Sequence, residues 1–237
     1  MKLNITFHEF CIAQFAIVTV VIALDLFAFL FTKSTGHDSV LGFLRLLNVD
    51  VEPSIPTYVS VVNLLLASML IFIIYGHEKT NKRKDAGYWL FLSILFLYLS
   101  VDESAKIHEN FSNIHRYLVH KELVSPILNT NQWLPYGAFF VFVVSIILFP
   151  FVMKLPTDTR RYFLIAGCVF VTGAVGLEYL SALMGDALPE SRKHTGRMVQ
   201  LLFEEGFEMY GVGIFNCALY REILRRKISV VIGDRQD

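Results

Sequence analysis

The sequence predicts an all-α membrane protein, a single bundle of six transmembrane helices with both termini in the cytoplasm. The composition is too apolar for a soluble protein, because 54% of the 237 residues are hydrophobic and only 18% are charged, whereas soluble domains average roughly a quarter charged. The apolar residues also gather in six blocks of about 18–25 residues, the length that crosses a hydrocarbon layer of ~30 Å. A soluble enzyme, a disordered chain and a disulfide scaffold are therefore excluded.

Each apolar block is predicted to be a helix, because a backbone in lipid must satisfy its own hydrogen bonds. Proline at position 135 fits the start of such a helix, where its missing N–H is harmless. The predicted spans are 10–31, 57–75, 88–101, 133–153, 162–184 and 198–220. Since no repeat or soluble segment separates them, residues 1–237 are expected to form one transmembrane domain.

The orientation follows from the basic residues, which concentrate on the cytoplasmic side of membrane proteins. Clusters of Lys and Arg occur in 77–86, in 154–161 and after residue 220. Six spans place all three clusters and the N-terminus on one side, which is typical of a multi-pass protein of a plasma membrane or bacterial inner membrane. The outer side receives the connections 32–56, 102–132 and 185–197. Of these, 32–56 and 102–132 are expected to contain interfacial helical segments at 39–47 and 104–124. The segment 104–124 either extends the third span past the lipid or lies on the surface.

The net charge is zero, with 21 Lys and Arg residues against 21 Asp and Glu residues. A chain without a basic excess has no long-range field that attracts nucleic acid. The expected partners are the lipid bilayer and a lipid-like or small-molecule substrate.

Ionisable residues inside the predicted spans fall in the outer half of the membrane. They include Asp25, Asp102, Glu178, Glu204 and Glu208. A charged carboxylate at mid-bilayer costs roughly 2.5–3.5 kcal/mol on insertion scales. These side chains must therefore face the bundle interior and be protonated, paired or bound to a metal.

Helical spacing places the polar residues in stripes. At about 100° per residue, one face of the last span collects several of them within about 60°. The three stripes are Arg197, Gln200, Glu204, Glu208 and Gly211; Tyr98, Asp102, Lys106, Glu109, Asn113 and Arg116; and Glu178, Ser181 and Gly185. Three stripes at matching depth predict one polar cavity that opens to the outer side.

The favoured interpretation of this cavity is a metal site that activates water or oxygen, since carboxylates and imidazoles bind zinc, iron or manganese. The chemistry would be hydrolysis or oxidation of a lipid-like substrate. The predicted metal ligands are Asp102, His108, Glu109, Glu178, Glu204 and Glu208, with Asp102, Glu109 and Glu204 as catalytic residues. The predicted supporting residues are Asp25, Asn63, Glu103, Glu205 and Arg197.

The imidazole of this site has two candidates, His108 and His194. In a regular helix His108 points about 120° away from Asp102. It joins the site only if the helix breaks near Ser104 or faces another partner.

Two other function classes stay open. A carboxylate cluster also suits a cation- or proton-coupled transporter, although the inner halves of the spans hold few polar groups. Alternatively, basic residues near the acids could form a structural ion-pair network in a non-catalytic sensor or partner-binding protein. These residues are Lys106, Arg116, Arg192, Lys193 and Arg197.

Three smaller features receive structural interpretations. Trp133 sits at a span end and is expected to be an interfacial anchor. His115 is expected on the surface. Gly173 and Gly176 are expected to permit close helix packing.

The run from Ser100 to Glu109 resembles the Ser-x-Asp-[Asp/Glu]-x4-His-Glu signature of uncharacterised bacterial polytopic membrane proteins. The run Glu204-Glu-Gly-Phe-Glu208 is similar to their companion motif in the last span. A fainter similarity is to the alkaline ceramidase and progestin-receptor-like membrane hydrolases. That resemblance implies zinc-dependent hydrolysis with Ser100 and Asp102 in the site, although the last span has glutamates where those proteins have a His-x-x-x-His pair.

Overall fold

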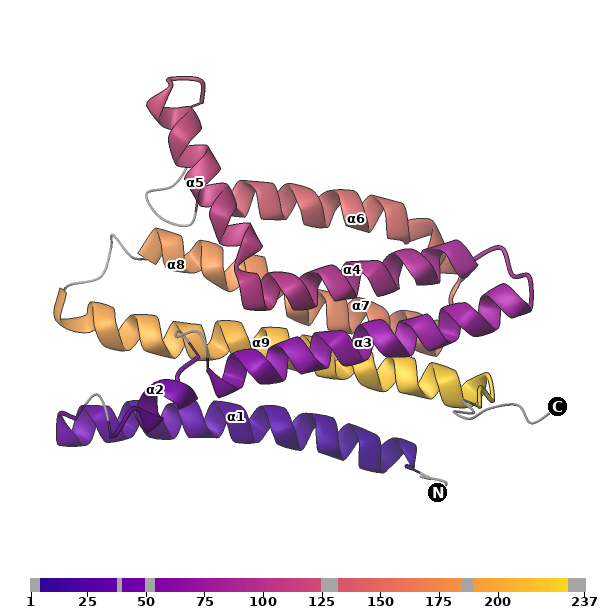
Figure 1. Cartoon of the computed structure of the whole chain (residues 1–237), viewed down its shortest axis with the longest axis horizontal. Coiled ribbons are helices and arrows are strands. Elements are labelled where there is room, and N and C mark those ends of the chain that lie inside the picture. Colours follow the sequence, from indigo (N-terminus) through magenta and orange to yellow (C-terminus); the bar gives the residue numbers. More distant parts are fainter. Residues whose placement is uncertain (1–4, 38–39, 50–53, 125–131, 185–189, 230–237) are drawn as a thin grey trace.

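The computed structural model describes residues 5–37, 40–49, 54–124, 132–184 and 190–229, and every regular element in these ranges is a helix (Figure 1). The all-α prediction is therefore confirmed. The helices are α1 (Phe7–Thr35), α2 (Phe43–Leu47), α3 (Ile55–Thr80), α4 (Ala86–Ala105), α5 (Ile107–His120), α6 (Leu134–Lys154), α7 (Thr157–Val171), the π-helix η1 (Thr172–Leu177), α8 (Glu178–Met184) and α9 (Glu190–Arg225).

The long helix α9 is the centre of the bundle. It packs against α1, α3, α7 and η1, and α3 pairs with α4 along most of its length. Helix α6 lies at the edge of the bundle in Figure 1 and packs mainly against α7 and η1. We call the end where α3 leads into α4 the basic end, and the end where α4 gives way to α5 the acidic end.

Five helical segments of the described chain are long and apolar enough to cross a membrane: α1, α3, α4, α6 and the continuous run Thr157–Leu183. The sequence predicted six. The sixth predicted span, 198–220, lies within α9, which is long enough but carries Glu204, Glu205 and Glu208 in its middle. Large apolar side chains on the outside of α6, such as Phe142 and Ile146, are 61% and 58% exposed, as expected for a surface in contact with lipid.

Local signals set the helix ends. Thr6 and Glu9 form a capping box at the start of α1, and Gly36 ends that helix in the left-handed conformation with φ +72°. Helix α2 falls within the predicted interfacial segment 39–47, of which residue 39 lies outside the described ranges.

One of the two predictions for 104–124 was that the third span continues as a single helix beyond the bundle. The structure shows that it does not. Lys106 has a φ of +50°, so α4 ends at Ala105 and α5 starts in a new direction at Ile107. In Figure 1, α5 projects away from the bundle. The predicted stripe from Tyr98 to Arg116 is therefore interrupted at Lys106.

An apolar core fills the basic end. Trp89 packs edge-on against Phe151 and Phe163, and Phe163 lies 4.6 Å from Phe215 between ring centroids. These four rings come from α4, α6, α7 and α9, so the core joins all four helices at this end.

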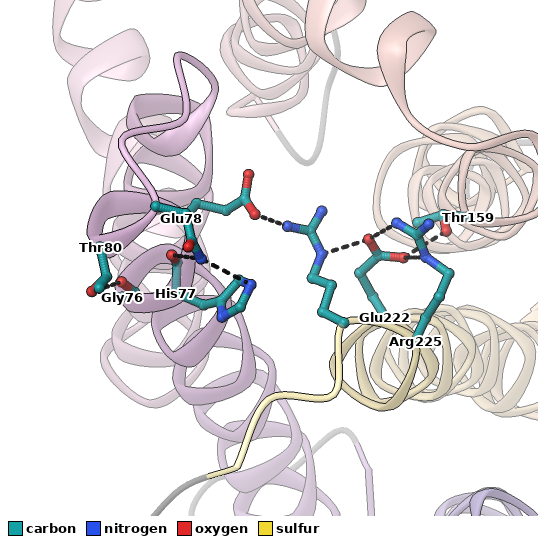
Figure 2. A network of polar contacts seen from close by, with 9 residues as sticks. Gly76, His77, Glu78, Thr80, Thr159, Glu222 and Arg225 are labelled. Carbon is teal, nitrogen blue, oxygen red and sulfur yellow. Dashed lines mark hydrogen bonds and ion pairs between the residues drawn. The ribbon is translucent and has the colours of Figure 1, made fainter.

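A buried ionic network completes the basic end (Figure 2). Glu222 is only 1% exposed, and it accepts hydrogen bonds from Thr159 Oγ1 at 2.9 Å, from Arg226 Nε at 2.7 Å and from Arg225. Arg226 also pairs with Glu78 of α3 and lies over the ring of Trp89. Hydrogen bonds and ion pairs of this network join α3, α7 and α9, and the cation–π contact adds α4. The network was not predicted from the sequence.

The network predicts a specific stability loss for Glu222→Gln. Burial by itself would raise the pKa of Glu222, but hydrogen bonds from Arg225, Arg226 and Thr159 outweigh burial, so the pKa is lowered. The ionised Glu222 carboxylate therefore stabilises the folded protein at a pH above its unfolded-state pKa, which is near 4.5. This stabilisation is lost as the pH falls through the lower pKa of Glu222 in the folded protein. We expect Glu222→Gln to cost about 3 kcal/mol at neutral pH, measured as a drop in Tm that shrinks in acid.

The matched control is Asp158→Asn, which breaks the exposed pair between Asp158 and Arg221. Exposed pairs contribute roughly 0–1 kcal/mol, so Tm should change little. Equal shifts in the two variants would contradict a stabilising role for the buried network.

Candidate functional site: a cavity with an acidic end

A cavity of about 1310 Å³ lies between α4, α6, the run from α7 to α8, and α9. Its walls toward the basic end are apolar, with Phe96, Leu148, Phe170 and Phe215 among them. The charged residues that line it gather toward the acidic end: Asp102, Glu103, Glu178, Glu204, Glu205, Glu208, Lys106, Arg197 and His108. The cavity is therefore amphipathic along its length.

Asp102 and His108 form a pair at the acidic end. The break at Lys106 turns the chain so that the His108 backbone N–H donates to Asp102 Oδ1 at 2.8 Å, and His108 Nδ1 lies 2.8 Å from Asp102 Oδ2. A helix break in this region was one condition under which His108 was expected to join the site, and the structure has that break. A carboxylate on Nδ1 fixes the ring and makes Nε2 the nitrogen that would act on a ligand.

Trp133 belongs to the same cluster. Its Nε1–H donates to Glu178 Oε1 at 2.8 Å, and its ring lies 4.6 Å from the His108 ring between centroids. The start of α6 thereby contacts both α5 and α8. Whether Trp133 is also a lipid-interface anchor stays a prediction, and the structure adds that both its ring and its N–H have partners inside the protein.

The predicted polar face of α9 is confirmed: Arg197, Gln200, Glu204, Glu208 and Gly211 all line the cavity. Glu204 is 9% exposed. Gln200 Nε2 donates to the Leu177 carbonyl at 2.9 Å and makes a longer contact of 3.4 Å with Glu204 Oε2. The amide thus links α9 to the end of η1.

Two glycines let η1 and α7 approach α9 closely. A Cβ at Gly173 would lie 2.7 Å from the Glu204 carbonyl oxygen, and one at Gly211 would lie 2.7 Å from the Phe170 nitrogen. The packing prediction for Gly173 is confirmed. For Gly176 it is wrong, because a Cβ there would meet no atom closer than 3.9 Å.

Some predicted residues lie elsewhere. Asp25 and Asn63 are buried but are not among the residues that line the cavity. Asp25 Oδ1 accepts a hydrogen bond from the Val49 N–H, and the Asn63 carbonyl accepts one from Asn216. The side chains of Glu109, Arg192, Lys193 and His194, and all of Gly185, lie outside the described part of the chain.

Helix α5 also departs from expectation. Asn113 and Arg116 are both exposed, and neither lines the cavity. His115, which was expected on the surface, is 2% exposed, and its Nδ1 lies 3.0 Å from the Tyr136 hydroxyl. This contact joins α5 to α6 beside the cavity.

Among the described residues, no group of three or more His, Cys, Asp and Glu side chains is placed so that it could hold a metal ion. The described members of the predicted ligand set therefore do not form such a group. What the described residues do form is a cavity with a carboxylate–imidazole pair, several further carboxylates and two cations at one end. Such an arrangement can bind a polar group and exchange protons with it.

A family model described as a domain of unknown function, DUF8692, matches residues 13–223. The chain belongs to this family. The DUF8692 match covers every residue that lines the cavity, from Val49 to Phe215, and also includes Glu222 of the basic-end network. No curated protein and no solved structure matches the chain.

The close approach of η1 to α9 predicts that Gly173→Ala is destabilising. The added methyl group would overlap backbone of α9, so the helices must move apart at a cost of about 1–3 kcal/mol. We expect a clear fall in Tm for Gly173→Ala. Gly176→Ala is the control, since its methyl group makes only ordinary contacts and should leave Tm unchanged or slightly raised. A harmless Gly173→Ala would show that this contact is not tight.

Proposed function

We propose that α9 is a sixth transmembrane helix and that both termini lie in the cytoplasm, in a plasma membrane or bacterial inner membrane. Helix α9 packs against α1, α3 and α7, which are all parts of candidate spans. Its acidic residues Glu204 and Glu208 line the internal cavity, which removes the cost of exposing them to lipid. The basic residues of 77–86 and 154–161 support the orientation. Reporter fusions at the two termini should then report the same, cytoplasmic side, and opposite sides would refute six spans.

We further propose that the protein binds a lipid-like molecule in the amphipathic cavity. The observation that carries this proposal is one continuous cavity of about 1310 Å³ with apolar walls and a charged end. Pockets for drug-sized ligands are roughly 300–1,000 Å³. A bound ion or small polar metabolite would leave the apolar walls uncovered, whereas an amphiphile covers the walls and the charged end together.

The chemistry that we propose acts on the polar head of this molecule. Asp102 orients His108 and stabilises its protonated form, so that the ring can take a proton from water or from a head-group hydroxyl and return it to a leaving group. Glu204 of α9 lines the same cavity and can orient the attacked group. A divalent metal (zinc, iron or manganese) held by His108 and neighbouring carboxylates would supply Lewis acidity to the same hydrolysis or oxidation.

Native mass spectrometry of the purified full-length chain tests the proposal. We expect one amphiphile to remain bound through mild detergent extraction and to be lost in Gly167→Phe. Gly167 lines the apolar part of the cavity, and a Cβ added there would meet no atom within 4 Å, so the new ring enters the cavity and blocks a chain. Gly76→Phe is the matched control, because Gly76 has equal room on α3 but does not line the cavity.

The outcomes separate cleanly. Retention in wild type and Gly76→Phe, with loss in Gly167→Phe, supports a lipid-like ligand. Equal retention in all three proteins would show that the co-purified molecule is bound elsewhere, and no retained molecule in wild type would also refute the proposal. Elemental analysis of the same samples tests the metal: stoichiometric zinc, iron or manganese that is lost in Glu204→Ala supports it, and none in wild type removes it.

A further inference from the structure

We infer that the cavity opens sideways into the bilayer between α4 and α6, and that its ligand is a membrane lipid whose acyl chain enters through this opening. We call the opening the side portal and place it at Tyr98 of α4 and Phe140 of α6. The inference rests on the proposed function, because it names the source of the lipid-like ligand and its route into the same cavity.

Helix α6 is held by its neighbours mainly on one flank. It packs against α7 and η1, and a connection of two residues, Leu155 and Pro156, ties it to α7 at the basic end. Both α4 and α6 are described along their whole length, and these two helices are not among the pairs that pack closely. Only 6% of the apolar stretch of α6 is buried, compared with 44% for that of α3. The flank that faces α4 is therefore the one that can admit a chain.

Aromatic contacts fix the two ends of the line along which α4 and α6 meet. At the basic end, Tyr88 stacks on Phe151 with the ring centroids 5.2 Å apart. At the acidic end the link runs through α5, whose His108 and His115 contact the start of α6. The stretch between these two ends borders the cavity from both helices.

One ring pair spans the stretch in between. The ring centroids of Tyr98 and Phe140 lie 6.3 Å apart, and both side chains line the cavity. Even so, Tyr98 is 39% exposed and Phe140 is 43% exposed, so neither ring is enclosed by the bundle. A single ring pair is a weak contact. It can therefore separate to let a chain pass and close again.

The lining of α6 continues past Phe140 to the outer face of the helix. At about 100° per residue, four lining residues follow one another around α6 in steps of about 40–60°. In this order they are Val144, Phe140, Val143 and Phe139. Phe139 is 68% exposed and lies within about 20° of Ile146, which is 58% exposed and does not line the cavity. The cavity thus reaches the lipid-facing surface on the α4 side of α6.

The side portal faces acyl chains. It lies inside two candidate membrane spans, because Tyr98 is seven residues before the end of α4 and Phe140 is six residues after the start of α6. Each position is about 10 Å of helix away from the helix end. The neighbouring surface of α4 is apolar and at least 46% exposed at Ile94, Leu97 and Val101. A molecule that crosses this opening comes from the hydrocarbon layer, so the ligand is a membrane lipid.

The experiment locks the side portal. In a chain whose three natural cysteines are replaced by alanine, Tyr98→Cys and Phe140→Cys are joined in the membrane by a short, reducible cross-linker. The protein is then moved into nanodiscs of a phospholipid with deuterated acyl chains. Native mass spectrometry after mild extraction follows the replacement of co-purified lipid by labelled lipid. We expect the cross-link to slow this replacement at least about tenfold, and reduction of the cross-link to restore it.

The matched control pair is Tyr88→Cys with Phe151→Cys. This pair joins the same two helices at the basic end, and neither residue lines the cavity. Each pair is compared with its own uncross-linked form, so that any loss of packing from the substitutions themselves is accounted for. The control cross-link should leave lipid replacement unchanged.

Removal of a ring should act in the opposite direction. Phe140→Ala widens the side portal and should speed the uptake of labelled lipid. Phe142→Ala is its control, because Phe142 is 61% exposed on the same helix and does not line the cavity. Equal uptake rates in these two variants would overturn the role of Phe140.

The failures of the two proposals differ. A complete cross-link between positions 98 and 140 that leaves replacement unchanged, or equal slowing by both cross-links, overturns the side portal and leaves the lipid-like ligand standing. Uptake of dihexanoyl-phosphatidylcholine from water, without uptake of the labelled bilayer lipid, overturns the bilayer as the source. If neither probe binds and wild type and Gly167→Phe retain the same molecules, both proposals fall.

Discussion

Carboxylates inside an apolar helical bundle have to share one polar surface, and the acidic half of this protein is arranged by that constraint. A single charged side chain in lipid costs several kcal/mol, whereas several of them around one cavity can share protons, cations and water. Glu204 and Glu208 on α9, Glu178 at the start of α8 and Asp102 near the end of α4 all line the same space. The close approach at Gly173 and the helix break at Lys106 both serve to bring these segments together.

Buried charged residues are arranged differently at the two ends of the bundle. At the basic end, Glu78 and Glu222 are matched by Arg225 and Arg226, and the network packs directly on an aromatic core. Such a matched, buried set fixes helix positions. At the acidic end, the described acids outnumber the cations and border a large cavity. The proposed ligand site lies in this open volume, whereas the basic end is packed.

The helices and much of the acidic cluster could be predicted from the sequence alone, because both depend on short-range regularities. Apolar runs mark spans, and the spacing of Arg197, Gln200, Glu204 and Glu208 places them on one face of any regular helix. The turn at Lys106 could not be predicted, since a lysine with positive φ leaves no compositional signal. The roles of Trp133, His115 and Glu222 were also missed, because each depends on a contact with a residue far away in the sequence. The predicted sixth span, within α9, is not among the five candidate spans, because the acids that place α9 at the cavity also lower its apolar character.

The proposed site depends most on the convergence of separate helices at the acidic end, and cysteine cross-linking in membranes measures this directly. The three natural cysteines, Cys11, Cys168 and Cys217, are first replaced by alanine. Cysteines are then placed at positions 133 and 178, because the native side chains at these positions are hydrogen-bonded to each other. We expect rapid cross-linking of this pair by a short reagent, and none for a control pair at 133 and 78, which lie at opposite ends of the bundle. A folded protein in which 133 and 178 fail to cross-link, or react no faster than the control pair, would contradict the convergence on which the proposed site depends.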